Sequence, residues 1–229
     1  MKRETSNFVR FIIEELIPPI IRDSFIFTKI IKLIHRKDKL HFQLKERIYN
    51  LDKNTYKKYY EKSSNIHDET DLTQKCIIEI KKNILPAKVL DVGCGNGYLL
   101  DKITKKNLIL FASDIKISDK AKKNFNKLKI NFKEEDILDM NYKKKSFDTV
   151  ICTHTLEHIL DIKKAYDKLS EIAKKRLIIV VPKERPYNHT FNGHIHFFPY
   201  SWSFINLIKP KNKFKIFNIG RDFFYLEKK

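Results

Sequence analysis

The decapeptide Val89-Leu90-Asp91-Val92-Gly93-Cys94-Gly95-Asn96-Gly97-Tyr98 contains three of the five glycines in this 229-residue chain. A β-branched run ends at an acid, a glycine-rich turn follows, and a helical pattern begins at Tyr98. Glycine is needed where a turn adopts positive φ or where a ligand touches the backbone. A strand, a glycine turn and a helix in this order predict a nucleotide site at the carboxyl end of the strand in an open α/β sheet.

The acid in this stretch helps to decide which nucleotide binds. The spacing is G-x-G-x-G and differs from the G-x-G-x-x-G of dinucleotide sites. A carboxylate at Asp91 would repel a pyrophosphate and would suit a ligand that carries an ammonium group. S-adenosylmethionine carries an ammonium and a sulfonium and no phosphate. The segment resembles motif I of the class I S-adenosylmethionine-dependent methyltransferases, acid-x-G-x-G-x-G. The alternative interpretation is a tight turn without a ligand.

The rest of the chain alternates strand and helix patterns. Strands are expected at 88–92, 108–113, 130–133, 147–153 and 177–181, and helices at 71–83, 98–106, 118–128, 162–174 and 201–208. Two final runs, 214–219 and 222–227, flank Gly220 and predict an antiparallel hairpin. The fold class is therefore α/β, with a Rossmann-like, mostly parallel sheet closed by a C-terminal hairpin, which is also the arrangement of the methyltransferase sheet.

The resemblance implies a set of cofactor contacts. Asp114 follows the second strand, 21 residues after Gly93, where an acid can accept hydrogen bonds from both ribose hydroxyls. In the family, an acid at the position of Asp136 approaches the adenine amino group, and the next apolar residue lies against the ring. Taken alone, each acid is better interpreted as a solvated loop carboxylate, and it is their order after successive strands that favours the cofactor role. The full expected set is Asp91, Gly93, Cys94, Gly95, Gly97, Tyr98, Asp114, Ile115, Asp136, Ile137, Thr153 and His154.

A competing motif follows the fourth expected strand. His154-Thr155-Leu156-Glu157-His158 matches H-x-x-E-H, a zinc-peptidase pattern. On a helix the two histidines would lie on one face and could share a metal, but a third protein ligand would still be needed. The methyltransferase sheet already accounts for this segment, so no metal is expected.

The long loop after the fifth expected strand supplies the candidate catalytic groups. Methyl transfer from a sulfonium is an in-line displacement that the enzyme mainly aligns, and a hydroxyl nucleophile also benefits from a base. His194 and His196 lie in this loop and would point the same way if it were extended. One of them is predicted to be the base or to contact substrate; the alternative is a structural role in packing the loop. Expected substrate contacts are Tyr59, Tyr60, His158, Tyr187 and His189.

Three segments (17–23, 59–72 and 181–199) resemble small methyltransferases of bacterial capsule and surface-polysaccharide synthesis. The resemblance implies O-methylation of a sugar, a heptose or similar, on a nucleotide or a growing glycan. A lipid or quinone acceptor would fit the amphipathic N-terminus, and RNA would fit the charge. Interpretations of another class are a non-catalytic binding protein that keeps the fold and a metal hydrolase.

Composition sets the remaining expectations. The chain carries 47 Lys and Arg against 28 Asp and Glu, a net charge of +19. Lysines provide most of this excess and are spread along the chain, so the charge does not by itself predict a nucleic-acid partner. Three scattered cysteines are expected to be reduced thiols. No secretory signal is recognised and no apolar run approaches the ~18 residues of a membrane span, so a cytoplasmic location is expected.

Two regions are expected: an N-terminal helical extension, 1–70, and an S-adenosylmethionine-binding domain, 71–229. Within the extension, residues 8–34 predict two short amphipathic helices divided by Pro18-Pro19. These helices are interpreted as a cap on the main domain or a contact in a homodimer. A second interpretation places them on a membrane surface.

Overall fold

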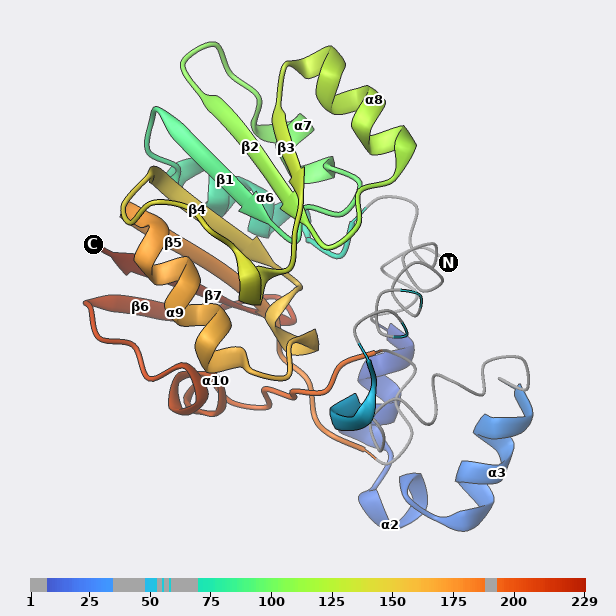
Figure 1. Cartoon of the computed structure of the whole chain (residues 1–229). Helices are drawn as coiled ribbons and strands as arrows, with labels where there is room; N and C mark the ends of the chain where they lie inside the picture. Colours follow the sequence, from blue (N-terminus) through green and yellow to red (C-terminus); the bar gives the residue numbers. More distant parts are fainter. Residues whose placement is uncertain (1–7, 35–47, 53–54, 56–57, 59–69, 188–192) are drawn as a thin grey trace.

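The computed structural model of the chain describes residues 8–34, 48–52, 55, 58, 70–187 and 193–229. These residues form a seven-stranded sheet with the order β3-β2-β1-β4-β5-β7-β6 (Figure 1). The strands are β1 (Lys88–Val92), β2 (Ile109–Asp114), β3 (Asn131–Glu134), β4 (Phe147–Thr153), β5 (Ala173–Pro182), β6 (Phe214–Ile219) and β7 (Asp222–Lys228). The first five are parallel, and β7 runs antiparallel to both β5 and β6. The expected fold class is confirmed.

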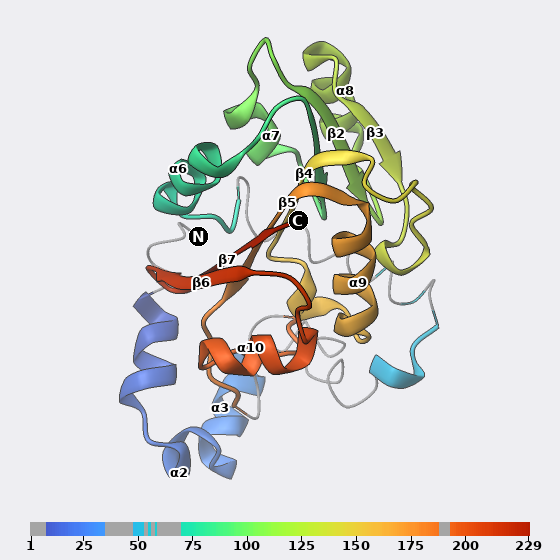
Figure 2. The ribbon, with the colours of Figure 1, turned by 90° about the vertical axis from the view of Figure 1, so that its left-hand side faces the viewer.

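Helices cover both faces of the sheet, and Figure 2 shows α6 and α9 on opposite sides of the strands. One face carries α6 (Gln74–Asn83), α7 (Tyr98–Ile103) and α8 (Asp119–Leu128), and the other carries α9 (Ile162–Ile172) and α10 (Ser201–Ile208). The period of a strand explains the two cores, because Val89 packs on the first face and Leu90 on the second. The central strands β4 and β5 are largely buried, as expected for a sheet covered on both sides.

Several element boundaries differ from the sequence prediction. The helix α9 ends at Ile172 and β5 already begins at Ala173, because Ala173 pairs with Phe147 of β4. The helix α6 begins at Gln74 and not at 71, since the Thr73 side chain caps it by accepting a hydrogen bond from the Cys76 N–H at 3.2 Å. The expected N-cap Ser118 is confirmed, with its hydroxyl oxygen 3.2 Å from the Ala121 nitrogen.

The N-terminal segment 8–34 has more breaks than expected. It contains η1 (Ile12–Leu16), α2 (Pro19–Arg22) and α3 (Phe25–Ile34), and η2 (Ile48–Asn50) follows later. Pro18-Pro19 separates the first two elements as predicted. The prediction of one helix after the prolines is wrong, because the chain breaks again at Asp23-Ser24, where the Ser24 hydroxyl oxygen accepts a hydrogen bond from the Phe27 N–H at 3.2 Å.

Buried ion pairs fasten this segment to the sheet domain. Arg10 lies 2.6 Å from Glu184 in the loop after β5, and Arg221 in the β6–β7 turn donates to Glu14. Other side chains of the segment remain exposed, among them Ile20 and Phe25, at 84% and 78%. Across the part of the chain that the structure describes, no helix is long and apolar enough to cross a membrane. The proposed boundary near residue 70 adjoins residues 59–69, outside the described part, and stays a prediction.

Candidate functional site

The glycine turn after β1 lies at the carboxyl edge of the sheet, between β2 and β4. Gly93, Gly95 and Gly97 all have positive φ, at 74°, 52° and 77°. A Cβ on Gly93 would lie 2.0 Å from Thr155 Oγ1, and one on Gly97 would lie 2.1 Å from the Phe125 ring. A Cβ on Gly95 would meet no atom of the described chain within 4 Å. Packing therefore requires the outer two glycines, while the middle one faces open space that a ligand could fill.

Asp114, at the end of β2, is bound to this turn. Its Oδ2 accepts a hydrogen bond from the Gly95 N–H at 2.8 Å, and its Oδ1 accepts one from the Lys116 N–H at 3.3 Å. Burial raises the pKa of the Asp114 carboxyl, although these backbone donors oppose the rise. The carboxylate expected at the ribose is therefore held beside the glycine backbone.

Asp91 is the most buried acid of the turn, with 1% of its surface exposed. Its Oδ1 has no hydrogen-bonding partner among the described residues. Burial, helped by the charge of Asp114, raises the pKa of Asp91 to about 8. An unpaired buried carboxylate is costly, and a cationic ligand group would relieve that cost. The ammonium of S-adenosylmethionine fits this requirement.

The remaining expected cofactor residues follow the neighbouring strands. The Asp136 carboxylate accepts a hydrogen bond from the Leu138 N–H at 2.9 Å and so caps η3 (Ile137–Asp139), directly after β3. Thr153 ends β4, and His154 follows with φ of 48°. Cys94, Tyr98 and Ile115 adjoin the turn, the start of α7 and the end of β2. The fold thus gathers the whole set along one sheet edge, and their contacts with a cofactor stay a prediction.

A buried cluster of acids and histidines adjoins the same edge. After β4 the chain forms η4 (Leu156–His158), in which Glu157 is fully buried. His154 lies between two carboxylates, with Nδ1 3.4 Å from Glu157 Oε1 and Nε2 3.4 Å from Asp222 Oδ1. His194 pairs through Nδ1 with Glu184, and its Nε2 lies 3.9 Å from Glu157 Oε1.

The loop after β5 is held over η4 by its backbone. The N–H groups of Ile195 and His196 both donate to the Glu157 carbonyl oxygen, at 2.9 and 3.0 Å. The His196 Nε2 lies 2.9 Å from the Ile159 carbonyl oxygen, and its ring stacks on Phe198. Residues 193–197 are not part of a strand, and the side chains of His194 and His196 have different partners.

Comparison with known proteins now adds to this geometry. Residues 90–181 match the family model described as a methyltransferase domain. This part of the chain is therefore similar to a methyltransferase domain. The cofactor of such a domain is S-adenosylmethionine, as the glycine turn and its acids predict.

Solved structures share the fold at low sequence identity. A SAM-dependent methyltransferase from Aquifex aeolicus is 16% identical with a TM-score of 0.56, over 78% of this chain and 99% of that one. Magnesium protoporphyrin IX methyltransferase from Synechocystis, solved with bound SAH, is also 16% identical, with a TM-score of 0.56. The match covers 77% of this chain and 99% of that one.

Curated relatives from several strains of one bacterium also match in sequence. A ubiquinone biosynthesis O-methyltransferase of Coxiella burnetii is 36% identical over 77 residues, 32% of this chain. The match spans about a third of that relative's length (33%).

The H-x-x-E-H motif does not form one helix in this structure. The helical turn η4 contains only Leu156–His158, and His154 lies outside it with positive φ. The two histidines therefore do not share a helical face. Instead, Glu157 and His158 are joined by His194, and one ligand atom from each lies within 4.8 Å of the others. Sequence reasoning missed this grouping because His194 comes from a different loop.

The expected substrate residues are only partly placed. The Tyr187 ring lies under the Arg22 guanidinium, 5.4 Å from centroid to Cζ. Burial, together with His194, lowers the pKa of His158 to about 3, and its Nδ1 lies 3.1 Å from the Gly193 carbonyl oxygen. Tyr59, Tyr60 and His189 lie outside the described residues.

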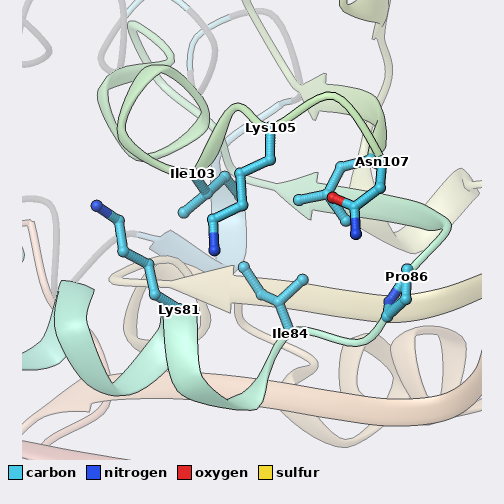
Figure 3. Close-up of a pocket in the computed structure, with 7 residues that line it drawn as sticks. Lys81, Ile84, Pro86, Ile103, Lys105 and Asn107 are labelled. Carbon is cyan, nitrogen blue, oxygen red and sulfur yellow. The ribbon is translucent and has the colours of Figure 1, made fainter.

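Two cavities lie away from the glycine turn. The one in Figure 3, about 70 Å³, is lined by residues such as Ile84, Pro86 and Asn107, which precede β1 and β2 at the amino edge of the sheet. The larger cleft, about 480 Å³, lies between the N-terminal segment and the loop after β5, and Arg22, Arg185 and Pro199 are among its lining residues. A cleft therefore lies beside the same loop that carries His194 and His196.

Proposed function

We propose that this chain transfers a methyl group from S-adenosylmethionine to a hydroxyl group of a small acceptor, a sugar of surface-polysaccharide synthesis. The observation that carries the proposal is the buried, unpaired Asp91 carboxylate beside the open backbone of Gly95. This combination suits a ligand that is cationic and lies against the main chain.

The chain's own residues bind and orient the cofactor. Asp91 takes the ammonium group, Asp114 the ribose hydroxyls, and Asp136 with Ile137 the adenine. Thr153 and His154 line the methionine portion. When bound, S-adenosylmethionine supplies a methyl group already activated by the positive charge on sulfur. The protein then has to align the acceptor oxygen with that methyl group and to exclude water.

His196 is the proposed base. A carbonyl oxygen can only accept, so the Nε2 of His196 carries the proton that is donated to Ile159, and the lone pair lies on Nδ1. That nitrogen can take the acceptor's hydroxyl proton as the oxygen attacks the methyl group. A positioned base of this kind contributes roughly 10²–10⁴ in rate.

Exposed aromatic rings beside the large cleft support a sugar acceptor. Tyr200 and Trp202 stack with centroids 5.5 Å apart and planes 10° apart, and Trp202 is 60% exposed. The Arg185 guanidinium lies 5.6 Å from the Tyr200 ring centroid. Flat rings suit the apolar face of a sugar, and an arginine suits a phosphate of a nucleotide-linked sugar acceptor.

A quinone precursor is the second candidate acceptor. It is favoured by the ubiquinone biosynthesis O-methyltransferase among the relatives and by the exposed apolar side chains of α2 and α3, such as Ile20 and Phe25. The proposed cofactor site is the same for both acceptors. The two candidates differ only in the chemical groups that the cleft would have to bind.

The first test is a calorimetric titration of the full chain with S-adenosylmethionine and S-adenosylhomocysteine. Saturable binding at one site per chain supports the proposal, and no binding to a folded protein overturns it. Mass spectrometry of reactions with nucleotide-linked heptoses and with a short-chain hydroxylated quinone precursor then decides the acceptor class. Methylation of the quinone precursor alone would replace the sugar proposal with the second candidate.

A further inference from the structure

Glu157, His158 and His194 form a compact group that the proposed reaction does not use. One carboxylate oxygen and one nitrogen from each imidazole ring lie within 4.8 Å of one another. The rings of His158 and His194 pack edge to face with centroids 4.7 Å apart. The carboxylate comes from η4 and is fully buried, while His194 arrives from the loop after β5 with a side chain 12% exposed.

Hydrogen bonds outside the group decide where the ring protons are. His158 Nδ1 lies 3.1 Å from the Gly193 carbonyl oxygen, which can only accept, so Nδ1 carries the proton and Nε2 keeps the lone pair. His194 Nδ1 contacts the Glu184 carboxylate, which accepts, so in the neutral form of this ring the proton lies on Nδ1 and the lone pair on Nε2. That Nε2 is 3.9 Å from Glu157 Oε1. Two lone pairs and a carboxylate therefore share one small space.

The Glu157 carboxylate is the buried group of the three that is not satisfied by a hydrogen bond from the described residues, although His154 Nδ1 lies 3.4 Å from its Oε1. Within the described chain, neither carboxylate oxygen of Glu157 forms a hydrogen bond. Glu184 and Asp222 are also buried nearby, and Arg10, the cation on Glu184, lies 2.6 Å from that carboxylate. Buried acceptors that face one another repel unless a proton or a cation lies between them.

We propose that Glu157, His158 and His194 bind a divalent transition-metal ion of the zinc class. One oxygen and two imidazole nitrogens are a zinc donor set, and three protein ligands leave a fourth position for solvent. A bound histidine usually donates its other N–H to a carboxylate or a backbone carbonyl, which is what Glu184 and Gly193 provide here. Ligand atoms about 2.0–2.1 Å from a tetrahedral zinc lie roughly 3.3 Å apart, so the side chains close in by about 1.5 Å at most.

Metal content of the purified full chain tests this directly. We expect about one zinc per chain after exhaustive dialysis, and saturable binding when the chelator-stripped protein is titrated with zinc chloride. Co²⁺ added to the stripped protein should give the visible absorption of a tetrahedral site, which requires no variant and therefore no change in folding. An octahedral spectrum or no stoichiometric binding would overturn the proposal.

Variants show whether the ion is at this place. His158→Ala and His194→Ala should each weaken zinc binding more than tenfold, whereas His196→Ala, from the same loop, should keep it. Undiminished binding in both of the first two variants would place the ion elsewhere and overturn the assignment. Because the readout is metal, the result is separate from the cofactor titration: a chain that binds zinc but no S-adenosylmethionine refutes only the proposed function.

Discussion

The backbone N–H of Gly95 donates to Oδ2 of Asp114 across 2.8 Å and so joins the turn after β1 to the end of β2. The bond places the second glycine, whose Cβ position is open, next to the carboxylate expected at the ribose. Two sequence signals separated by a whole helix thereby become one structural unit. That unit can be tested from either side.

The substitution Asp114→Ala removes the carboxylate that accepts the hydrogen bond from Gly95. Without the carboxylate, cofactor affinity should fall more than tenfold, a loss of about 1.4 kcal/mol or more. Calorimetry measures the affinity, and circular dichroism confirms that the variant is folded. As a control, Asn107→Ala, in the cavity at the opposite edge of the sheet, should leave affinity unchanged. Wild-type affinity in Asp114→Ala would refute the ribose role.

Comparing Gly95→Ala with Gly93→Ala separates a loss of ligand binding at the glycine turn from a loss of packing. Gly95→Ala should cost only about 1 kcal/mol of stability from its positive φ, but its methyl group should block the ligand and weaken binding. Gly93→Ala should be destabilised by more, because its Cβ meets Thr155 Oγ1 at 2.0 Å. Urea denaturation gives both stabilities. Full cofactor affinity in a folded Gly95→Ala would contradict the site.

Asp91 should make stability depend on pH. Its pKa is about 8 in the folded chain and near 3.8 when unfolded, so the folded state holds the extra proton between these values. Stability contributed by this group therefore falls as pH rises from about 4 to 8, by up to about 5 kcal/mol. Asp91→Asn should lose less stability than the wild type over this range. If the free energy of unfolding changed with pH in the same way for both proteins, Asp91 would not hold that proton.

The same shift predicts proton release when the cofactor binds. A cationic ligand group favours the ionised carboxylate, so at pH 7 the wild type should release close to one proton and Asp91→Asn should release fewer. Calorimetry in two buffers with different ionisation enthalpies measures the number. Equal release from both proteins would move the ammonium site away from Asp91.

The proposed base is tested by His196→Ala once an acceptor is known. The turnover number should fall by roughly 10²–10⁴ while cofactor affinity stays the same, and the limb of the pH–rate profile due to the base should disappear. Turnover within about threefold of the wild type would exclude His196 as an essential base.

Local signals explain what the sequence could predict. The glycine turn and the alternating strands β1 to β5 depend on neighbours along the chain, so their residues reveal them. The place of Asp114 at the end of β2 and the Ser118 cap were also predicted from position along the chain. The early start of β5 at Ala173 was missed because it depends on pairing with Phe147, and the second break at Ser24 because its cap is a single side chain.

The group of Glu157, His158 and His194 could not be predicted from neighbours along the chain. From the sequence, Glu157 and His158 are considered together with His154 as a helical metal motif, and no metal is expected there. The third member of the group, His194, is held beside Glu157 by the Ile195 and His196 N–H groups, which donate to the Glu157 carbonyl oxygen. No spacing rule connects two loops that meet only after the sheet has formed.

The strand order has a consequence for how such a protein can diversify. Because the chain runs outward from β1 through β2 to β3 and then returns to β4, one continuous stretch, 88–139, carries nearly all the proposed cofactor contacts. The groups proposed for the acceptor and the base come from later residues, mainly 183–202, together with the N-terminal segment. Recombination or insertion within the later stretch can therefore create a new specificity while the inherited cofactor half stays intact.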